Sequence, residues 1–396
     1  MKPLDIAIAG CGVAGLACAA MLRARGARVV VYDRLQTPQP IGSGLILQPV
    51  GLHVLDEIGV GARMRELGAR IDRLYGKSGE RTVLDVRYGA LGRDAACGVS
   101  VHRGALFQLL YDAAIAAGAE MEAGREIVAA RGGRLVFADG TESARFDLVI
   151  DALGMRSPLS EPPQQNLPFG ALWASLDFVG GFDPHALEQR YEAARKMVGV
   201  LPIGKLPKNA GEAPAVGEKV AFFWSLKHSA RNAWLARDLD EWKSDVLALW
   251  PQTAPLLGQI NAHSDLVFAA YAHRTMRSPV SQECVQVGDS WHCTSPQLGQ
   301  GANMALLDAF ALAQALERQS NLETALHEYA RLRLWHIRLY QAASFLFTPA
   351  YQSDSSAMAW VRDFIMSPLS RVPPAPAILA ALVAGQWGSP LNALSA

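Results

Sequence analysis

The N-terminal part of the chain has a hydrophobic pattern that predicts a strand, a helix and a second strand. Residues 4–9 form a short apolar run, and residues 12–25 are rich in Ala and Leu up to a glycine at position 26 that would stop a helix. Residues 28–33 are rich in Val and predict the second strand. Because few residues separate these elements, we expect a compact βαβ unit.

The pattern continues to residue 154 with helices, a hairpin and a further strand. Helical stretches are predicted at about residues 50–69 and 103–117. Two short runs, residues 71–77 and 81–89, flank Ser78-Gly79 and predict a hairpin. The apolar run at residues 147–154 is expected to return the chain to the first sheet.

The pattern changes at about residue 166, where strand signals follow one another without intervening helices. Three runs predict antiparallel strands with loop signals between them: residues 171–179, 195–204 and 219–227. One helix is predicted near residues 239–250, and a strand at 285–289 with a helix to about 317 then resumes the first pattern. We therefore expect a second, sheet-rich domain inserted into the first.

Length, charge and cysteine usage narrow the class of protein. The 396 residues exceed the roughly 250–300 at which a single core stops growing, so we expect two domains. Lys plus Arg and Asp plus Glu number 37 each, so no basic field favours nucleic acid, and we expect none to be bound. The five cysteines lack C-x-x-C spacing, which argues against disulfides and metal sites and favours the cytoplasm. No signal-peptide pattern or membrane-spanning apolar run is present in the sequence.

The stretch AGCGVAGLACAA carries Gly10, Gly12 and Gly15 in G-x-G-x-x-G spacing between the first strand and the helix. The tight turn needs Gly10, close approach of a pyrophosphate needs Gly12, and helix–strand packing needs Gly15. Val13 and Ala14 open the helix, whose N-terminal amides would face the phosphates. This motif, in its βαβ setting, predicts a dinucleotide site.

Two residues at the end of the second strand belong to the same prediction. Asp33 is in position to accept a hydrogen bond from a ribose hydroxyl. Arg34 follows it and has two interpretations: a solvated surface arginine, or a contact to the adenine or to a 2′-phosphate.

A second motif, VQVGDSWHCTSPQLGQGANMALLDA, spans residues 285–309 and joins a β-branched run to an apolar helix. Glycines at a strand-to-helix junction let backbone amides approach a ligand, and a helix N-terminus favours negative charge. The motif therefore predicts that an anionic or electron-rich group is held at residues 299–302.

The pair GCGVAG and GDSWHCTSPQLGQGANMALLDA resembles the group A flavoprotein monooxygenases of the p-hydroxybenzoate hydroxylase type, including the ubiquinone-pathway hydroxylases, over residues 1 to about 320. The resemblance implies FAD as cofactor, with NADH or NADPH as co-substrate. It further implies hydroxylation of an apolar aromatic substrate by O2 through a C4a-hydroperoxyflavin, the substrate being of phenol, quinolone or quinone-precursor type.

The fold implied by the resemblance is α/β: a Rossmann-like FAD-binding domain, an inserted antiparallel-sheet substrate domain and a helical C-terminal region. We expect the FAD-binding domain at residues 1–72, 98–165 and 272–325. The substrate domain is expected at residues 73–97 and 166–271, and the helical region at 326–396.

The resemblance also assigns residues to the cofactor. Asp289 would bind the ribityl hydroxyls, and the loop from Pro296 to Gly301 would lie beside the isoalloxazine. The helix that begins near Gly301 would point its positive end at flavin N1 and O2. Arg103, in VHRGALFQLL, inherits a contact to FAD. The predicted cofactor residues in these segments are Arg103, Gly288, Asp289, Pro296, Gly299, Gln300, Gly301, Ala302 and Asn303.

The segment DLVIDALGMRSPL departs from the family pattern. Where the family has Gly-Ala-Asp-Gly, this chain has Asp151-Ala152-Leu153-Gly154. Residues two apart on a strand point the same way, so we expect Asp151 to replace part of the missing carboxylate and, with Gly154, to contact the cofactor. The resulting D-A-x-G-x-x-S arrangement also occurs in related flavin halogenases and reductases.

The substrate pocket is expected between the flavin loop and the inserted sheet. Its predicted lining, with plain core packing as the alternative for each residue, is Leu47, Trp173, Leu201, Phe222, Trp224 and Tyr271. The candidate catalytic residues are Pro296 and three groups that could orient a phenol or accept its proton: His228, Tyr271 and His273. Neither the inserted strands nor the flavin loop shows a recurring arginine suited to binding a substrate carboxylate, so we expect a mostly apolar substrate. Single arginines that could still bind a carboxylate are Arg190, Arg195 and Arg274.

His292 lacks a triad partner and metal-ligand spacing in the sequence, so we interpret it as a structural, hydrogen-bonded histidine. In the C-terminal region, the apolar stretches 330–351 and 378–387 have two interpretations. One is peripheral membrane contact, and the other is packing on the FAD-binding domain or contact within an oligomer.

Three other functions fit parts of the sequence. A flavin halogenase fed by a separate reductase would share D-A-x-G-x-x-S, but the W-x-W-x-I-P pattern of halogenases is absent. An FAD-dependent oxidoreductase without oxygen insertion would consume oxygen without forming product. A flavin-binding protein without activity is supported only by Leu153.

Overall fold

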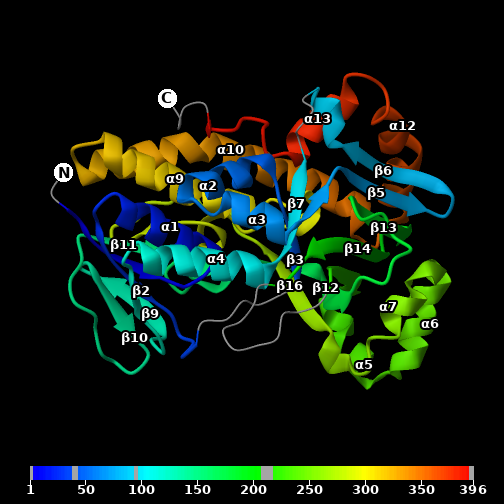
Figure 1. Ribbon diagram of the computed structural model, residues 1–396, viewed down its shortest axis with the longest axis horizontal. Helices are drawn as coiled ribbons and strands as arrows, with labels where there is room; N and C mark the ends of the chain where they lie inside the picture. The colour runs from blue at the N-terminus through cyan, green and yellow to red at the C-terminus, as the bar shows by residue number, and fades with distance from the viewer. Residues whose placement is uncertain (1–2, 38–42, 93–96, 207–216, 392–396) are drawn as a thin grey trace.

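The computed structural model describes residues 3–37, 43–92, 97–206 and 217–391, and its N-terminal strands form a parallel sheet (Figure 1). β1 (Asp5–Ala9) lies at the centre, paired in parallel with β2 (Arg28–Tyr32) and β11 (Leu148–Asp151). β17 (Val285–Gln286) and β8 (Glu120–Glu122) complete the order β17-β11-β1-β2-β8. α1 (Val13–Ala24) joins β1 to β2, so the predicted βαβ unit is confirmed.

Both faces of this sheet are covered, as its continuous apolar strands require. One face packs against α1 and α9 (Gly301–Arg318), and the other against the hairpin of β9 (Ile127–Arg131) and β10 (Arg134–Phe137). α10 (Leu322–Tyr351) lies along α9, and α4 (Arg103–Ala116) lies beside α1. α10 therefore confirms that the first apolar C-terminal stretch packs on this part of the molecule.

The helix expected at about residues 50–69 is two helices. α2 (Pro49–Ile58) ends at Gly59, whose φ of 89° is left-handed, and α3 (Gly61–Leu67) follows. A small sheet beside them has the order β3-β7-β4, made of Gly44–Leu47, Gly98–His102 and Ala69–Ile71. The end of β3 lies close to the start of α9, which places it at the candidate site described below.

The second large sheet has seven strands in the order β16-β12-β15-β14-β13-β5-β6. Their bounds are Val267–His273, Gln165–Asp177, Lys219–Lys227, Lys196–Gly204, Ala186–Glu192, Arg73–Ser78 and Arg81–Arg87. All neighbours are antiparallel except β13 and β5, which pair in parallel. The hairpin β5–β6 agrees with the prediction, whereas β13 was missed because its sequence, ALEQRYE, is polar and charged.

One face of this sheet carries three helices, α5 (Arg231–Ala236), α6 (Leu239–Leu249) and α7 (Ala254–Leu257). Their side chains, with Trp242 at the centre, pack against Leu172, Phe222 and Trp224 of the strands. The opposite face is turned toward the first sheet and the C-terminal helices (Figure 1). Only this opposite face can contribute to a site shared with the first sheet.

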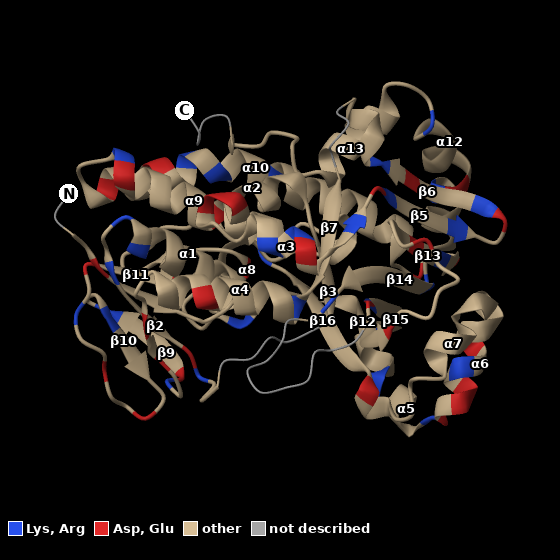
Figure 2. Ribbon diagram, in the orientation of Figure 1, with Lys and Arg blue, Asp and Glu red and all other residues tan. Residues whose placement is uncertain are grey.

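The C-terminal residues form short helices after α10. They are α11 (Ser356–Val361), a π-helix at Arg362–Met366, α12 (Ser367–Leu369) and α13 (Ala375–Val383). Among the described residues, no helix is both long enough and apolar enough to cross a membrane. Residues of both charges are spread along the ribbon of Figure 2, while α13 carries none.

Candidate functional site

Two glycines shape the turn between β1 and α1. Gly10 has a φ of +107°, and a Cβ there would lie 2.5 Å from the carbonyl oxygen of Ala152. A Cβ at Gly15 would lie 2.0 Å from the carbonyl oxygen of Gly10. A Cβ at Gly12 would meet no atom within 4 Å, and this residue is exposed. Gly10 and Gly15 are thus required by packing, whereas Gly12 leaves an open surface at the helix start.

The start of α1 is open to a ligand. Gly12 is the N-cap residue and supplies no capping side chain, so the amides of Val13 and Ala14 in the first turn have no side-chain acceptor. Half-buried Asp33 fixes the turn from the side, because its carboxylate accepts the amides of Cys11 and Leu35, both at 2.9 Å. An open, uncapped helix start of this kind can bind a pyrophosphate.

The glycine loop before α9 forms a second opening. Pro296 begins a 3₁₀ turn (Pro296–Leu298), Gly299 follows with a φ of +62°, and Gln300 is the N-cap of α9 without a capping hydrogen bond. A Cβ at Gly299 or Gly301 would meet no atom within 4 Å. We call residues 296–303 the flavin loop. Its exposed glycines and uncapped helix end have the geometry predicted from the sequence.

Two side chains of the flavin loop hold the loop itself. Buried Asn303 accepts the Gln48 amide at 2.8 Å and donates to the carbonyls of Ile46 and Gly299, each at 3.1 Å. Gln300 donates to the carbonyl of Val383 at 2.6 Å. Both side chains are therefore held within the protein, although the buried Gln300 Oε1 has no hydrogen-bond partner among the described residues.

The turn before α8 (Asp289–His292) separates two predicted cofactor residues. Gly288 is buried between α1 and α9, and a Cβ there would lie 3.2 Å from Ala14 Cβ. Asp289 is exposed at the first position of α8. Farther along, the Ser295 hydroxyl is buried and has no hydrogen-bond partner among the described residues. This unpaired hydroxyl, the open glycines and the two uncapped helix ends fit a group with phosphates at α1 and a polar ring at α9.

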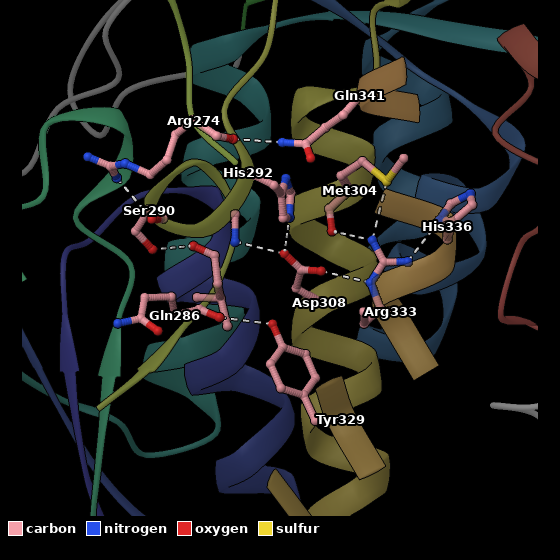
Figure 3. A network of polar contacts seen from close by, with 12 residues as sticks. Arg274, Gln286, Ser290, His292, Met304, Asp308, Tyr329, Arg333, His336 and Gln341 are labelled. Carbon is pink, nitrogen blue, oxygen red and sulfur yellow. Dashed lines mark hydrogen bonds and ion pairs between the residues drawn. The ribbon is translucent and has the colours of Figure 1, made fainter. Parts of the chain in front are cut away.

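A buried network ties this site to α10 (Figure 3). His292 Nε2 lies 2.6 Å from one oxygen of Asp308, which also accepts the Gly288 amide at 2.7 Å. Arg333 donates from Nε to the other oxygen at 2.7 Å and from a terminal nitrogen to His336 Nδ1 at 2.8 Å. The geometry agrees with the structural role expected of His292.

The titration of this network follows from burial and charge. Burial raises the pKa of Asp308, because it disfavours the charged carboxylate. The charges and hydrogen bonds of His292 and Arg333 have a larger, opposite effect and hold the pKa of Asp308 below its usual value. Burial, aided by the Arg333 charge, lowers the pKa of His336 to about 3. Asp308, Arg333 and His336 were missed in the sequence, although charged residues on the buried stripe of an apolar helix are a usable signal.

The expectation that Asp151 contacts the cofactor is not supported by its surroundings. Its carboxylate is completely buried and accepts hydrogen bonds from the hydroxyls of Ser157 (2.7 Å) and Ser160 (2.8 Å) and from the amide of Leu153 (3.1 Å). Burial raises the pKa of Asp151. This carboxylate stabilises the loop after β11, which Gly154 enters with a φ of +77°.

Arg274 is likewise structural. Its guanidinium is buried and donates to the carbonyls of Pro162, Ser290 and Met155 at 2.9–3.1 Å. It is therefore not available to clamp a substrate carboxylate. Of the other two candidates, Arg190 lies 3.5 Å from Glu188 and over the Trp250 ring, and Arg195 is exposed.

The predicted pocket residues divide between two faces of the seven-stranded sheet. Trp173 is paired with Phe223 and Leu172 with Trp224, and side chains directly opposite each other share a face. Phe222 and Trp224 therefore lie under the three helices, away from Trp173, and their prediction as pocket residues is wrong. The prediction of Leu47 as a pocket residue is also wrong, because Leu47 is fully buried in the core beneath α2 and α9.

The catalytic candidates divide in the same way. His228 is exposed, with its ring 5.7 Å from that of Phe268, which pairs with Leu172 on the helix-covered face. It is therefore not beside Tyr271, and its prediction is wrong. His273 is half-buried, bonded through Nε2 to Thr275 at 2.9 Å, and burial lowers its pKa.

Tyr271 and Trp173 form a polar contact on the face turned toward the first sheet. Trp173 Nε1 donates to the Tyr271 oxygen at 3.2 Å, and an indole nitrogen can only donate. Burial raises the pKa of Tyr271 to about 12, although the Trp173 hydrogen bond and the nearby charge of exposed Arg103 oppose the shift. Tyr271 is therefore neutral at pH 7, with its own proton directed away from Trp173.

A sequence model of the family described as FAD binding domain matches residues 3–338. The chain belongs to the group A FAD-dependent monooxygenases. The residues at α1 and α9 are accordingly those that would hold FAD, and this family uses NAD(P)H as the source of electrons. The p-hydroxybenzoate hydroxylase-type fold expected from the sequence is confirmed.

Relatives of this monooxygenase cover most of its length. The aurachin C monooxygenase/isomerase of Stigmatella aurantiaca is 24% identical over 380 residues, covering 93% of this chain and 94% of the relative. A putative 2-heptyl-3-hydroxy-4(1H)-quinolone synthase of Rhodococcus erythropolis is 27% identical over 341 residues, covering 81% and 82%. The solved tetrameric form of 2-methyl-3-hydroxypyridine-5-carboxylic acid oxygenase superposes with a TM-score of 0.78 at 20% identity, covering 99% and 98%.

Proposed function

We propose that this monooxygenase hydroxylates an apolar aromatic ring that carries a hydroxyl or oxo group. The observation that supports the proposal is the Tyr271–Trp173 contact, which presents a neutral hydroxyl on the sheet face turned toward the FAD-binding part. The flavin loop is linked to the same sheet, because Gln297 donates to Gln352 at 3.3 Å and Gln352 donates to the Gly170 carbonyl at 3.1 Å.

The roles of individual side chains follow from this arrangement. FAD, when bound, supplies the transfer of electrons from NAD(P)H and the activation of O2. Tyr271 would donate its hydrogen bond to the substrate oxygen and so orient the ring, while Trp173 holds the Tyr271 oxygen. Trp173 supplies apolar surface that excludes water, and buried Leu201 belongs to the cluster against which Trp173 packs. Pro296, exposed at the start of the flavin loop, would lie beside the reacting ring.

The substrate class is inferred from the same face and from the relatives. The relatives are named for a quinolone and for a hydroxypyridine carboxylic acid, both oxygen-bearing aromatic rings, of which only the second carries a carboxylate. The three arginines considered for a carboxylate clamp are engaged elsewhere or exposed, as described above. We therefore favour a phenol, quinolone or quinone precursor without a carboxylate.

Purified protein tests the proposal directly. FAD-loaded protein is mixed in air with NADH or NADPH, with and without a panel of phenols and quinolones. The proposal expects one ring compound to accelerate NAD(P)H oxidation and to yield a product heavier by one oxygen atom. A Tyr271→Phe variant should raise KM and release more hydrogen peroxide. Oxidation without oxygenated product from any compound would contradict the proposal and favour an oxidoreductase without oxygen insertion.

A monooxygenase fed by a separate reductase is the second candidate. One observation favours it: Leu153 stands at the position of the family aspartate, and the nearby Asp151 carboxylate accepts hydrogen bonds from Ser157 and Ser160. If neither NADH nor NADPH bleaches the flavin absorbance without air, but chemically reduced protein hydroxylates a substrate, this candidate replaces the first.

The exposed apolar side chains of the C-terminal helices support self-association. Trp335, Phe345, Leu346, Trp360 and Leu369 are each more than half exposed. We propose that a second copy of the chain covers them in the cytoplasm, and the tetrameric solved relative supports this choice. Light scattering after size exclusion should show a dimer or larger oligomer. A monomer that co-sediments with lipid vesicles would instead favour peripheral membrane contact.

A further inference from the structure

Gln300 is the side chain that fastens the flavin loop to the C-terminal helix. Gly299 and Gly301 flank it, so the backbone at this point has unusual conformational freedom. The Gln300 side chain is 4% exposed, and its amide donates to the carbonyl of Val383 at 2.6 Å. The first turn of α9 is therefore restrained by the end of α13.

The end of α13 is itself held by three side chains from two other helices. The last carbonyls of a helix lack partners within the helix. Here Tyr340 donates to Leu382 at 2.8 Å, Gln300 to Val383, and His336 Nε2 contacts the Gly385 carbonyl at 3.1 Å. A Cβ at Gly385 would lie 2.4 Å from a methyl group of Val50, so only glycine allows this close docking.

α13 also touches the sheet that carries Trp173 and Tyr271. Ala380, Val383 and Ala384 share one apolar cluster with Leu201 and Ile203 of β14. Trp173 packs against the edge of the same cluster. One short helix thus contacts the flavin loop through the Gln300 hydrogen bond and the substrate sheet through apolar packing.

We propose that α13 couples the substrate sheet to the flavin loop, with Gln300 as the positioning residue at the flavin end. The inference rests on the proposed function, because it assigns α13 the task of holding the loop where oxygen transfer requires it. When the loop is loose, the electrons of NAD(P)H reach O2 without hydroxylation. That side reaction consumes NAD(P)H, O2 and one proton and yields NAD(P)⁺ and hydrogen peroxide.

Hydrogen exchange on the full-length protein, with and without FAD, tests the restraint independently of activity. Gln300→Met keeps the length of the side chain and removes the hydrogen bond, and should speed amide exchange at residues 299–303 about fivefold. Tyr340→Phe loosens α13 from the α10 side and should speed the same amides in the same direction. With a hydroxylated substrate, the ratio of peroxide to product should rise in both variants while KM for NAD(P)H stays near the wild-type value.

Tyr329→Phe is the matched control, because Tyr329 is a buried tyrosine on α10 whose hydroxyl donates to the Gln286 carbonyl at 2.9 Å, away from α13. It should leave exchange at residues 299–303 and the peroxide ratio unchanged. The inference is overturned if Gln300→Met leaves the exchange at the wild-type rate, or if Tyr340→Phe has no effect on it. A wild-type enzyme that forms no oxygenated product would refute the proposed function, while the exchange rates would still decide the role of α13.

Discussion

Replacing Arg333 with methionine removes the cation at the centre of the buried network. Arg333 and Asp308 are both 0% exposed, and the Nε–Oδ1 distance is 2.7 Å. Methionine fills much of the same volume but leaves the Asp308 carboxylate with His292 and the Gly288 amide, and leaves His336 Nδ1 without its donor. The variant therefore buries an incompletely compensated charge.

The expected cost follows from this change. Removing one partner of a buried ion pair costs about 3–5 kcal/mol. Because Asp308 keeps two hydrogen bonds, we expect Arg333→Met to lower the free energy of unfolding by about 3 kcal/mol, at the low end of that range. Adding Asp308→Asn removes the stranded charge, so the double variant should be more stable than the sum of the two single effects predicts, by roughly 1–2 kcal/mol.

Denaturant unfolding at pH 7.5 measures these free energies, followed by tryptophan fluorescence. Trp291 is a suitable reporter because its ring centroid lies 5.4 Å from that of His292. A loss below about 1 kcal/mol in Arg333→Met would refute the reasoning, since that is the size of a surface contact. Strictly additive single and double variants would refute it as well, because they would show that the two side chains do not interact.

Three further predictions follow from the same geometry. Gly15→Ala places a Cβ against the Gly10 carbonyl and should weaken FAD binding at least about tenfold, which fluorescence titration of the apoprotein would measure; unchanged affinity would contradict the packing argument. Phe222→Ala should lower the free energy of unfolding by about 3–5 kcal/mol and leave KM of the folded enzyme unchanged. Trp173→Ala should instead raise KM for the aromatic substrate. The reverse pattern would show that the two residues were assigned to the wrong faces of the sheet. His336 is neutral in the folded state, because its pKa is lowered to about 3, whereas in the unfolded chain its pKa is about 6.5. Between pH 3 and about pH 6.5, the unfolded chain therefore binds one proton more at this residue than the folded chain does. The free energy of unfolding should therefore fall as pH drops through this window, by less in His336→Gln. Denaturant unfolding at pH 7 and pH 5 measures it, and an equal loss in the wild type and the variant would count against the assignment.

The sequence alone determined the features that depend on local spacing. Glycines at positions 10, 12 and 15, set between an apolar run and an Ala-rich helix, predicted the turn and the open helix start that the structure contains. The flavin loop was predicted for the same reason, because left-handed or uncrowded backbone needs glycine wherever it occurs. In the seven-stranded sheet, the apolar strands β12, β14 and β15 were found, whereas the charged strand β13 and the apolar strand β16 were not.

Tertiary structure decided everything that depends on a distant partner. Phe222, Trp224 and Trp173 are equally aromatic in the sequence, and only the pairing of β12 with β15 and the position of the three covering helices determine which face each one occupies. Asp151 was expected at the cofactor because strand alternation gives its direction, but the serines that occupy its oxygens are supplied by the folding of the following loop. Arg333 and Gln300 find their partners 25 and 83 residues away, a distance at which spacing along the chain carries no information about contact.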